Sequence, residues 1–520
     1  MNSYVLPRYQ NGQGRLTAKA SFLLLAAILL MVLFVQTLAQ ARTSSLTFDE
    51  GPHIAAGYAY LRTDDLRLQP VHIHPPLANV LAAAPLLLQP DLPDPRQIDG
   101  WEIASLSAVT DAVVWQYPHP ARMALAARLP IIGMTLLLAA VVCRWAADLW
   151  GPRGGLLALF LLAFDPNVIA HGSLVTTDMA VTLWGTAALF LAARALRRPR
   201  GSLAAGTGLL LGLALASKVS AVSLVPALLV LALLAPVPLR HRLTAALGGL
   251  ALAALVLWAV YRFEVRAVPG FPIPLPAATH LEIYRSLQEH YRLGHPAFLM
   301  GQNRDHGWWY YFPVAFALKT PLPTVLLALA ALIGKPALTL RRWAPLAVFP
   351  LMYLASTPLS SVNIGYRHLL PVLPFLFILA GRTGAQAKAR GLQAKACATL
   401  QAKACATVQA EACATSQAKA RATYSLLPTP YSLLRIASLS WLALGTLRVS
   451  PHYLAFFNEL AGGPAGGYRY LVDSNLDWGQ NLWQLRDWMR ENGVERVFYA
   501  HYSPARPEVY GVSADWLPPD

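Results

Sequence analysis

Two adjacent carboxylates, Asp49 and Glu50, follow directly on an apolar run in the stretch SLTFDEGPHIAAGYAYL, residues 45–61. A carboxylate can accept the proton of a hydroxyl as a new bond forms, and neighbouring carboxylates can bind a divalent cation. Both residues also suit the start of a helix, where Asp49 would cap the first turn and Glu50 would face the positive end of the helix dipole. The residue types leave these roles open.

A third carboxylate, Asp178, and the lysine Lys218 lie at the ends of other apolar runs. An aspartate at the centre of a membrane span costs about 2.5 to 3.5 kcal/mol on insertion scales, so ionisable residues near spans usually face a wet cavity or a partner. Asp178 is equally typical of a helix N-cap, and Lys218 of a side chain that snorkels to the interface. An ion pair between the two would also suit a transporter.

The composition predicts an integral membrane protein. The 520 residues are 56% hydrophobic and only 13% charged, with a mean hydropathy of +0.43. Soluble proteins have about a quarter of their residues charged. The net charge of +16 comes from basic residues between apolar runs, which set the topology of membrane proteins. The sequence has no basic stripe with interleaved aromatics, so it does not indicate a nucleic-acid partner.

Apolar runs of membrane-spanning character predict about eleven transmembrane helices. The first is favoured as an uncleaved signal anchor, because it is long for a signal peptide. With a cytoplasmic N-terminus, the short basic loops near 197–200, 240–242 and 335–342 all fall inside, as the positive-inside rule requires. The runs lie near residues 21–40, 129–149, 155–172, 178–196, 203–218, 219–236, 243–262, 321–338, 344–357, 368–381 and 432–449.

Acidic residues indicate which segments are outside the membrane. Of the 26 Asp and Glu residues, 22 lie in three stretches, 49–120, 263–305 and 451–520. We therefore expect large external segments at about 41–125 and 263–320 and an external tail from 451. The cytoplasmic side offers no glycine-rich phosphate loop and no D-x-D pair, which argues against a soluble nucleotide donor.

The C-terminal third predicts three further units. Residues 383–423 contain an Ala/Gln/Lys-rich repeat of period eight, interpreted as an inert cytoplasmic insertion more readily than as a partner-binding arm. Residues 424–450 hold the final span, and 451–520 an external tail with a helix near 480–491 and a strand near 496–502. Asp477 and Gln480 have the spacing of a capping box. The tail stops within this small unit, which suggests a truncated C-terminus.

Five motifs together carry a resemblance. They are TFDEGPHIAAGYAYL, HIHPPLANVLAAAPLLL at 72–88, AFDPNVIAHGSLVTTDMAVTLWGTAALFLA at 163–192, GHPAFLMGQNRDHGWWYYFPVAFALKTPLP at 294–323 and NIGYRHLLPVLPF at 363–375. In this order and topology the chain resembles the GT-C superfamily, in the phospholipid carrier-dependent branch similar to protein O-mannosyltransferases and the lipid A aminoarabinose transferase. The fold implied is an α-helical polytopic bundle, with residues 1–382 as its catalytic module.

The resemblance implies that a sugar is transferred, with inversion, from a polyprenyl-phosphate donor to an acceptor at the external face of a bacterial cell membrane. Asp49 matches the family's catalytic aspartate, Glu50 is a metal ligand or orienting partner, and Asp178 belongs to the substrate pocket. The donor phosphate needs positive charge, for which we expect His74, Lys218 and Arg367.

Trp308 and Trp309 in RDHGWWYYF suit a sugar platform and equally an aromatic membrane belt. No cofactor is certain, although a divalent cation at Asp49 and Glu50 remains an option. The sugar and the acceptor stay open. The alternatives are a polytopic lipid or solute transporter and a non-catalytic envelope assembly subunit; against the former, the spans show no internal repeat.

Overall fold

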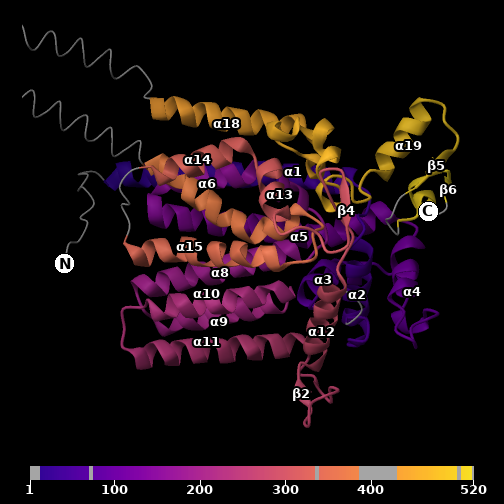
Figure 1. Ribbon diagram of the computed structural model, residues 1–520, viewed down its shortest axis with the longest axis horizontal. Helices are drawn as coiled ribbons and strands as arrows, with labels where there is room; N and C mark the ends of the chain where they lie inside the picture. Colours follow the sequence, from indigo (N-terminus) through magenta and orange to yellow (C-terminus); the bar gives the residue numbers. More distant parts are fainter. Residues whose placement is uncertain (1–11, 70–73, 334–338, 386–429, 501–504, 518–520) are drawn as a thin grey trace, which may run out of the picture.

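The computed structural model describes residues 12–69, 74–333, 339–385, 430–500 and 505–517. Figure 1 shows long helices lying side by side, with shorter elements gathered at one end of them. This is the polytopic helical bundle that the hydropathy pattern predicts.

All eleven predicted runs contain helix, but not all are full-length spans. Within the described residues, five helices are long and apolar enough to cross a membrane, and a bent pair would make a sixth. The other five runs form helices that are shorter or less apolar, so the expected eleven full spans are not reached by length and composition. The five helices that could cross a membrane are Thr17–Thr43 within α1 (Gly12–Thr43), α5 (Pro120–Trp150), α8 (Asp178–Arg197), α11 (Leu239–Val260) and Tyr366–Ala385, which begins with the 3-10 helix η6 (Tyr366–Val372).

One candidate span is bent sharply at a proline. The bent pair consists of α13 (Tyr311–Lys319) and α14 (Leu322–Leu332), which meet at 104°. Pro321 lies at this bend, and a proline cannot donate the backbone hydrogen bond that would continue α13. The helices of the five remaining runs are α6 (Pro152–Ala163), α9 (Gly201–Leu215), α10 (Leu224–Leu233), α15 (Leu340–Ser356) and α18 (Pro430–Arg448).

The polar end of the bundle is built from short helices and small sheets. Two sheets are antiparallel hairpins, and the third, in the tail, is parallel. The helices are α2 (Glu50–Thr63), α3 (Leu77–Ala83), α4 (Leu106–Thr110), α7 (Pro166–His171), α12 (Ala278–Leu293) and α19 (Leu482–Glu491). The paired strands are β1 (Val265–Arg266) with β2 (Leu275–Pro276), β3 (Ala297–Leu299) with β4 (Gln302–Arg304), and β5 (Val497–Tyr499) with β6 (Ala514–Trp516).

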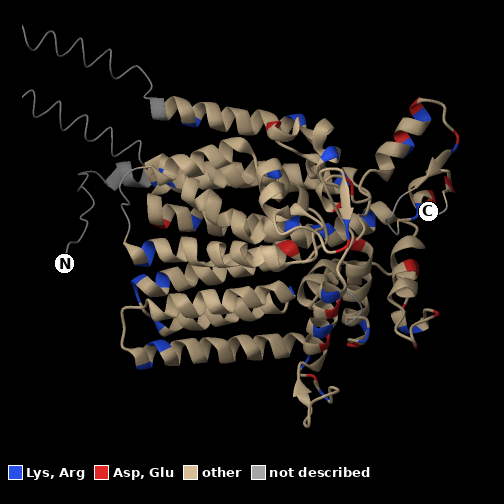
Figure 2. Cartoon of the chain, viewed as in Figure 1, with Lys and Arg blue, Asp and Glu red and all other residues tan. Residues whose placement is uncertain are grey.

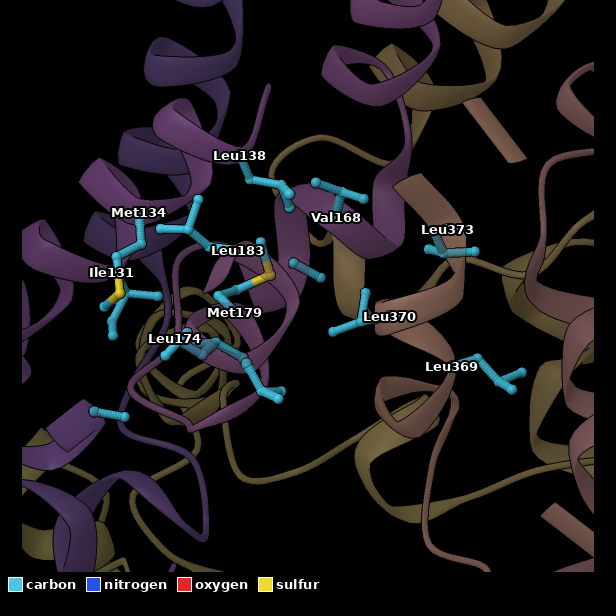
Figure 3. Packing of buried hydrophobic residues seen from close by; sticks show 14 of the residues in the cluster. Ile131, Met134, Leu138, Val168, Leu174, Met179, Leu183, Leu369, Leu370 and Leu373 are labelled. Atoms are coloured by element: carbon cyan, nitrogen blue, oxygen red, sulfur yellow. The ribbon is translucent and has the colours of Figure 1, made fainter. Parts of the chain in front are cut away.

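One hydrophobic core joins the helices. Figure 3 shows its centre, where side chains of α5, α8 and the segment that begins at η6 pack together. Small residues allow close approach: a Cβ on Gly208 of α9 would lie 2.4 Å from the carbonyl oxygen of Gly249 in α11. Such contacts are typical of helices packed in lipid.

Charge divides the bundle along its length. In Figure 2 most Asp and Glu lie at the end that carries α2, α4, α12 and α19, whereas Lys and Arg also mark the opposite end of α8, α9 and α11. The insertion from 386 onward lies outside the described residues.

The tail contains the predicted helix and strand, but its capping box is not formed. Asn481 is the N-cap of α19 and makes no side-chain cap. Gln480 instead accepts a hydrogen bond from the backbone N–H of Trp478 at 2.6 Å, and Asp477 accepts one from Gly479 at 3.0 Å. The two side chains fold the loop before the helix, so the capping-box prediction is wrong.

Candidate active site

Four charged side chains from four elements form a continuous chain of contacts at the polar end of the bundle. Lys218 Nζ donates to Asp178 Oδ1 at 2.5 Å, and Arg367 Nη1 lies 4.0 Å from Asp178 Oδ2. The same Arg367 Nη1 donates to Asp49 Oδ2 at 2.6 Å. The structure therefore brings together two of the three carboxylates and two of the three cations that the sequence singles out.

Each member of this chain is held at the end of an element. Asp49 precedes α2, Asp178 begins α8, Lys218 precedes the 3-10 helix η4 (Val219–Ser223), and Arg367 lies in η6. Helix and loop ends place side chains at the boundary of the bundle without interrupting a span. The arrangement depends on the fold, because Asp49 and Arg367 are 318 positions apart in the chain.

Exposure separates Asp49 from the other three. Its side chain is 25% exposed, whereas those of Asp178, Lys218 and Arg367 are 2%, 6% and 9% exposed. Asp49 occupies the N-cap position of α2 but makes no side-chain cap. The helix-cap interpretation of Asp49 is therefore wrong, and its carboxylate is the most exposed of the four charged groups.

Several buried polar atoms around this chain have no hydrogen-bond partner among the described residues. They are Asp178 Oδ2, Arg367 Nε, His53 Nδ1 and His368 Nε2. Buried polar atoms are normally paired, so a group of such atoms in one place indicates a polar ligand or ordered water. The guanidinium of Arg367 also lies over the ring of Trp478, 4.3 Å from its centre, in a cation–π contact.

Two histidines adjoin the site. Burial, reinforced by nearby Lys218, lowers the pKa of His74 well below its ordinary value. Burial also lowers the pKa of His53, while Asp49 opposes that shift. Both are therefore neutral at pH 7, so His74 can offer a hydrogen bond to a phosphate but not the positive charge that was expected of it.

Glu50 points to a different part of the molecule from Asp49. Its side chain is fully buried and forms a two-pronged ion pair with Arg128, at 2.8 and 2.6 Å. Its oxygens also accept hydrogen bonds from the backbone N–H groups of Thr47 and Val175, each at 2.9 Å. Glu50 thus joins the start of α2 to α5 and to the loop before α8.

These contacts do not fit the metal-ligand role suggested for Glu50. Both of its oxygens are already occupied, and within the described residues no group of three or more His, Cys, Asp or Glu could hold a metal ion. Glu50 instead positions the loop that carries Asp49.

The two tryptophans expected as a sugar platform differ in their surroundings. Trp308 is 4% exposed, its backbone N–H donates to Asn363 at 2.6 Å, and Arg304 lies over its ring at 5.3 Å. Trp309 is 68% exposed. Only Trp309 presents a free aromatic face, so the pair is not a shared platform.

Two residues of this region were not predicted from the sequence: Arg128, which pairs with Glu50, and Trp478, which packs on Arg367. Arg128 lies just before the run predicted at 129–149 and inside the longer observed helix α5, where a buried arginine needs a partner. Trp478 lies in the sequence DSNLDWGQ, where the carboxylates drew attention and the aromatic ring did not.

Comparison with known proteins agrees with this architecture. The family model described as dolichyl-phosphate-mannose-protein mannosyltransferase matches residues 122–261, from α5 to the end of α11. The crystal structure of ArnT from Cupriavidus metallidurans bound to undecaprenyl phosphate matches with a TM-score of 0.54 and 15% identity, over 96% of this chain and 86% of that chain. Among curated proteins, no sequence matches.

Two further structures are similar at a level that carries no argument. ArnT from the same organism in the apo state has a TM-score of 0.49 and 17% identity, over 96% of this chain and 86% of that chain. The archaeal oligosaccharyltransferase AglB from Archaeoglobus fulgidus, in complex with an inhibitory peptide and a dolichol-phosphate, has a TM-score of 0.39 and 13% identity. This match covers 89% of this chain and 58% of that chain.

The chain is thus a multi-pass membrane protein with the GT-C fold. The family match over residues 122–261 and the similarity in fold to ArnT agree with the resemblance that the five motifs indicate.

Proposed function

We propose that this protein transfers a sugar from a polyprenyl-phosphate donor to an acceptor at the external face of a bacterial cell membrane, with inversion at the anomeric carbon. The observation that carries the proposal is the contact chain Asp49, Arg367, Asp178 and Lys218 at one end of an apolar bundle. The similarity to ArnT, whose structure holds undecaprenyl phosphate, supports a lipid-phosphate donor.

Asp49 is the general base of the proposed reaction. The acceptor oxygen forms a bond to the anomeric carbon while the bond from that carbon to the phosphate oxygen breaks, and the hydroxyl proton passes to Asp49. A carboxylate placed to take this proton is typically worth about 10² to 10⁴ in rate. The partial exposure of Asp49 supports this role, because the acceptor has to reach it.

Lys218 and Arg367 stabilise the departing lipid phosphate, and the neutral His74 adds a hydrogen bond. In the structure these cations face carboxylates, so the four charges sum to zero before the donor enters. Asp178 lies between the two cations and holds both in place. The oxygens of the donor phosphate accept hydrogen bonds from the remaining donor atoms of these side chains, including the unpaired Nε of Arg367.

Trp309 makes the aromatic contact to the sugar, because its ring is exposed whereas that of Trp308 is buried. Carbohydrate stacking needs an open aromatic face.

A direct assay tests the proposed reaction. The purified chain is incubated with decaprenyl-phosphate-linked hexoses and pentoses, with an extract of envelope glycolipids and proteins as acceptors. We expect release of decaprenyl phosphate with one of these donors and no transfer from nucleotide sugars. Transfer from a nucleotide sugar, or unaltered glycans in cells that lack the chain, would contradict the proposal.

A further inference from the structure

A cleft of about 850 Å³ lies in the half of the bundle farthest from the proposed active site. Its walls come from the end of α8, the first part of α9, α10 and the first part of α11. Almost all lining side chains are small or aliphatic. In Figure 1 these helices lie side by side, with the active-site elements at their other end.

The depth of the cleft matches one leaflet of a bilayer. Along α9 the lining runs from Gly201 to Leu211, which at 1.5 Å per residue is about 15 Å. The hydrocarbon core of a bilayer is about 30 Å thick, so one leaflet is about 15 Å deep. A fatty acyl chain that enters at the helix ends would be covered to the middle of the membrane.

The mouth of the cleft is basic. Arg200, His241 and Arg242 line it at the ends of α9 and α11. Arg242 is held there by donating to the carbonyl oxygens of Leu233, at 2.5 Å, and Val237, at 2.8 Å. Within the described residues, neither Arg200 nor His241 forms an ion pair with a carboxylate.

The surrounding surface has the same sign. Arg194 and Arg197 lie in the last turn of α8, and Arg197 Nη2 lies 3.9 Å from a carboxylate oxygen of Asp148. Basic pockets between transmembrane helices suit anionic lipid headgroups.

We propose that this cleft is a binding site for an anionic glycerophospholipid, separate from the donor site. The phosphate and headgroup lie at Arg200 and Arg242, and an acyl chain lies along the apolar walls formed by α9, α10 and α11. The proposal stands independently of the catalytic assignment, because it uses none of the four active-site charges.

Two substitutions test the two halves of the site. Arg200→Gln removes a charge at the mouth, with Arg198→Gln as the matched control, since Arg198 is exposed at the same end but does not line the cleft. Gly248→Phe fills the cleft, because a side chain at Gly248 meets no atom within 4 Å. Gly133→Phe in α5 is its control, since Gly133 has equally open space outside the cleft.

The measurement is photo-crosslinking of the full chain in nanodiscs. Phosphatidylglycerol and phosphatidylcholine probes carry the same diazirine acyl chain, and labelled peptides are identified by mass spectrometry. In the wild type we expect phosphatidylglycerol to label α9 to α11 in preference to phosphatidylcholine. Arg200→Gln should lower that labelling about five-fold, and Gly248→Phe should abolish it. Neither control should change it.

Three outcomes would overturn the proposal. Equal labelling by the two lipids in the wild type would mean an ordinary lipid-facing surface. An equal loss in Arg198→Gln or Gly133→Phe would mean that the effect does not belong to the cleft. Displacement of the probe by decaprenyl phosphate at lower concentration than by phosphatidylglycerol would assign the cleft to the sugar carrier.

Discussion

Asp49 and Glu50 are neighbours in the chain with different surroundings. Successive side chains on a helix point about 100° apart, so two adjacent carboxylates at a helix start rarely share one site. Asp49 contacts Arg367, and Glu50 contacts Arg128, residues 318 and 78 positions away. The sequence indicates that both are unusual, but partners so distant cannot be assigned without the fold.

Removal of Arg128 should destabilise the protein strongly. Arg128→Met leaves Glu50 as an unpaired buried charge, which costs about 3 to 5 kcal/mol in unfolding free energy. The measurement is thermal unfolding of purified protein in detergent. Glu50→Gln combined with Arg128→Met should recover part of the loss, because no uncompensated charge remains. An Arg128→Met protein that unfolds at the wild-type temperature would contradict a structural ion pair.

At the scale of elements, the apolar pattern predicts where helices lie better than how long they are. Each of the eleven runs contains helix, yet the run 155–172 is divided at Asp165–Pro166 into α6 and α7, and Pro321 lies at the bend between α13 and α14. The capping-box prediction for Asp477 and Gln480 is wrong because a tertiary contact sets this loop. Trp478 packs against Arg367, and this tertiary contact sets the loop that Gln480 then stabilises. Spacing in sequence cannot anticipate such a contact.

The contact of α12 with the end of α11 should depend on pH. His280 Nδ1 lies 3.1 Å from the Tyr261 hydroxyl, and burial lowers the pKa of His280 to about 4. The unfolded chain binds a proton at this histidine below about pH 6.5, whereas the folded chain does so only near pH 4. The unfolded state is therefore favoured progressively as the pH falls from 6.5 to 4.

Thermal unfolding at several pH values tests this dependence. The wild-type melting temperature should fall between pH 6.5 and pH 4, and His280→Gln should lose less over that interval. Other buried histidines, such as His53 and His74, should retain part of the fall in the variant. Identical profiles for the two proteins would show that His280 is not buried in the neutral form.

Most carboxylates of the molecule lie at one end of the bundle, and basic residues mark the helix ends opposite (Figure 2). The sequence predicts this division from charge alone, because arginines cluster between apolar runs and carboxylates gather in three stretches. It could not predict the cleft between α9, α10 and α11, since a cavity depends on how small side chains of separate helices face one another.

Accessibility labelling tests the orientation that this division predicts. Asp94→Cys and Glu508→Cys should react with a membrane-impermeant thiol reagent in intact spheroplasts, whereas Arg240→Cys should react only after lysis. The unsubstituted chain gives the background of its four native cysteines. Reaction of Arg240→Cys from outside would reverse the proposed topology and place the active site on the cytoplasmic side.

The central claim is that Asp49 takes the acceptor proton, and its most direct test is the turnover of Asp49→Asn. Asparagine keeps the shape of the side chain and removes the base, so turnover with a polyprenyl-phosphate donor should fall by about 10² or more while the protein still folds. Asp94→Asn, in the same external segment, is the matched control and should retain wild-type turnover. Transfer by purified Asp49→Asn protein at near the wild-type rate would contradict the mechanism.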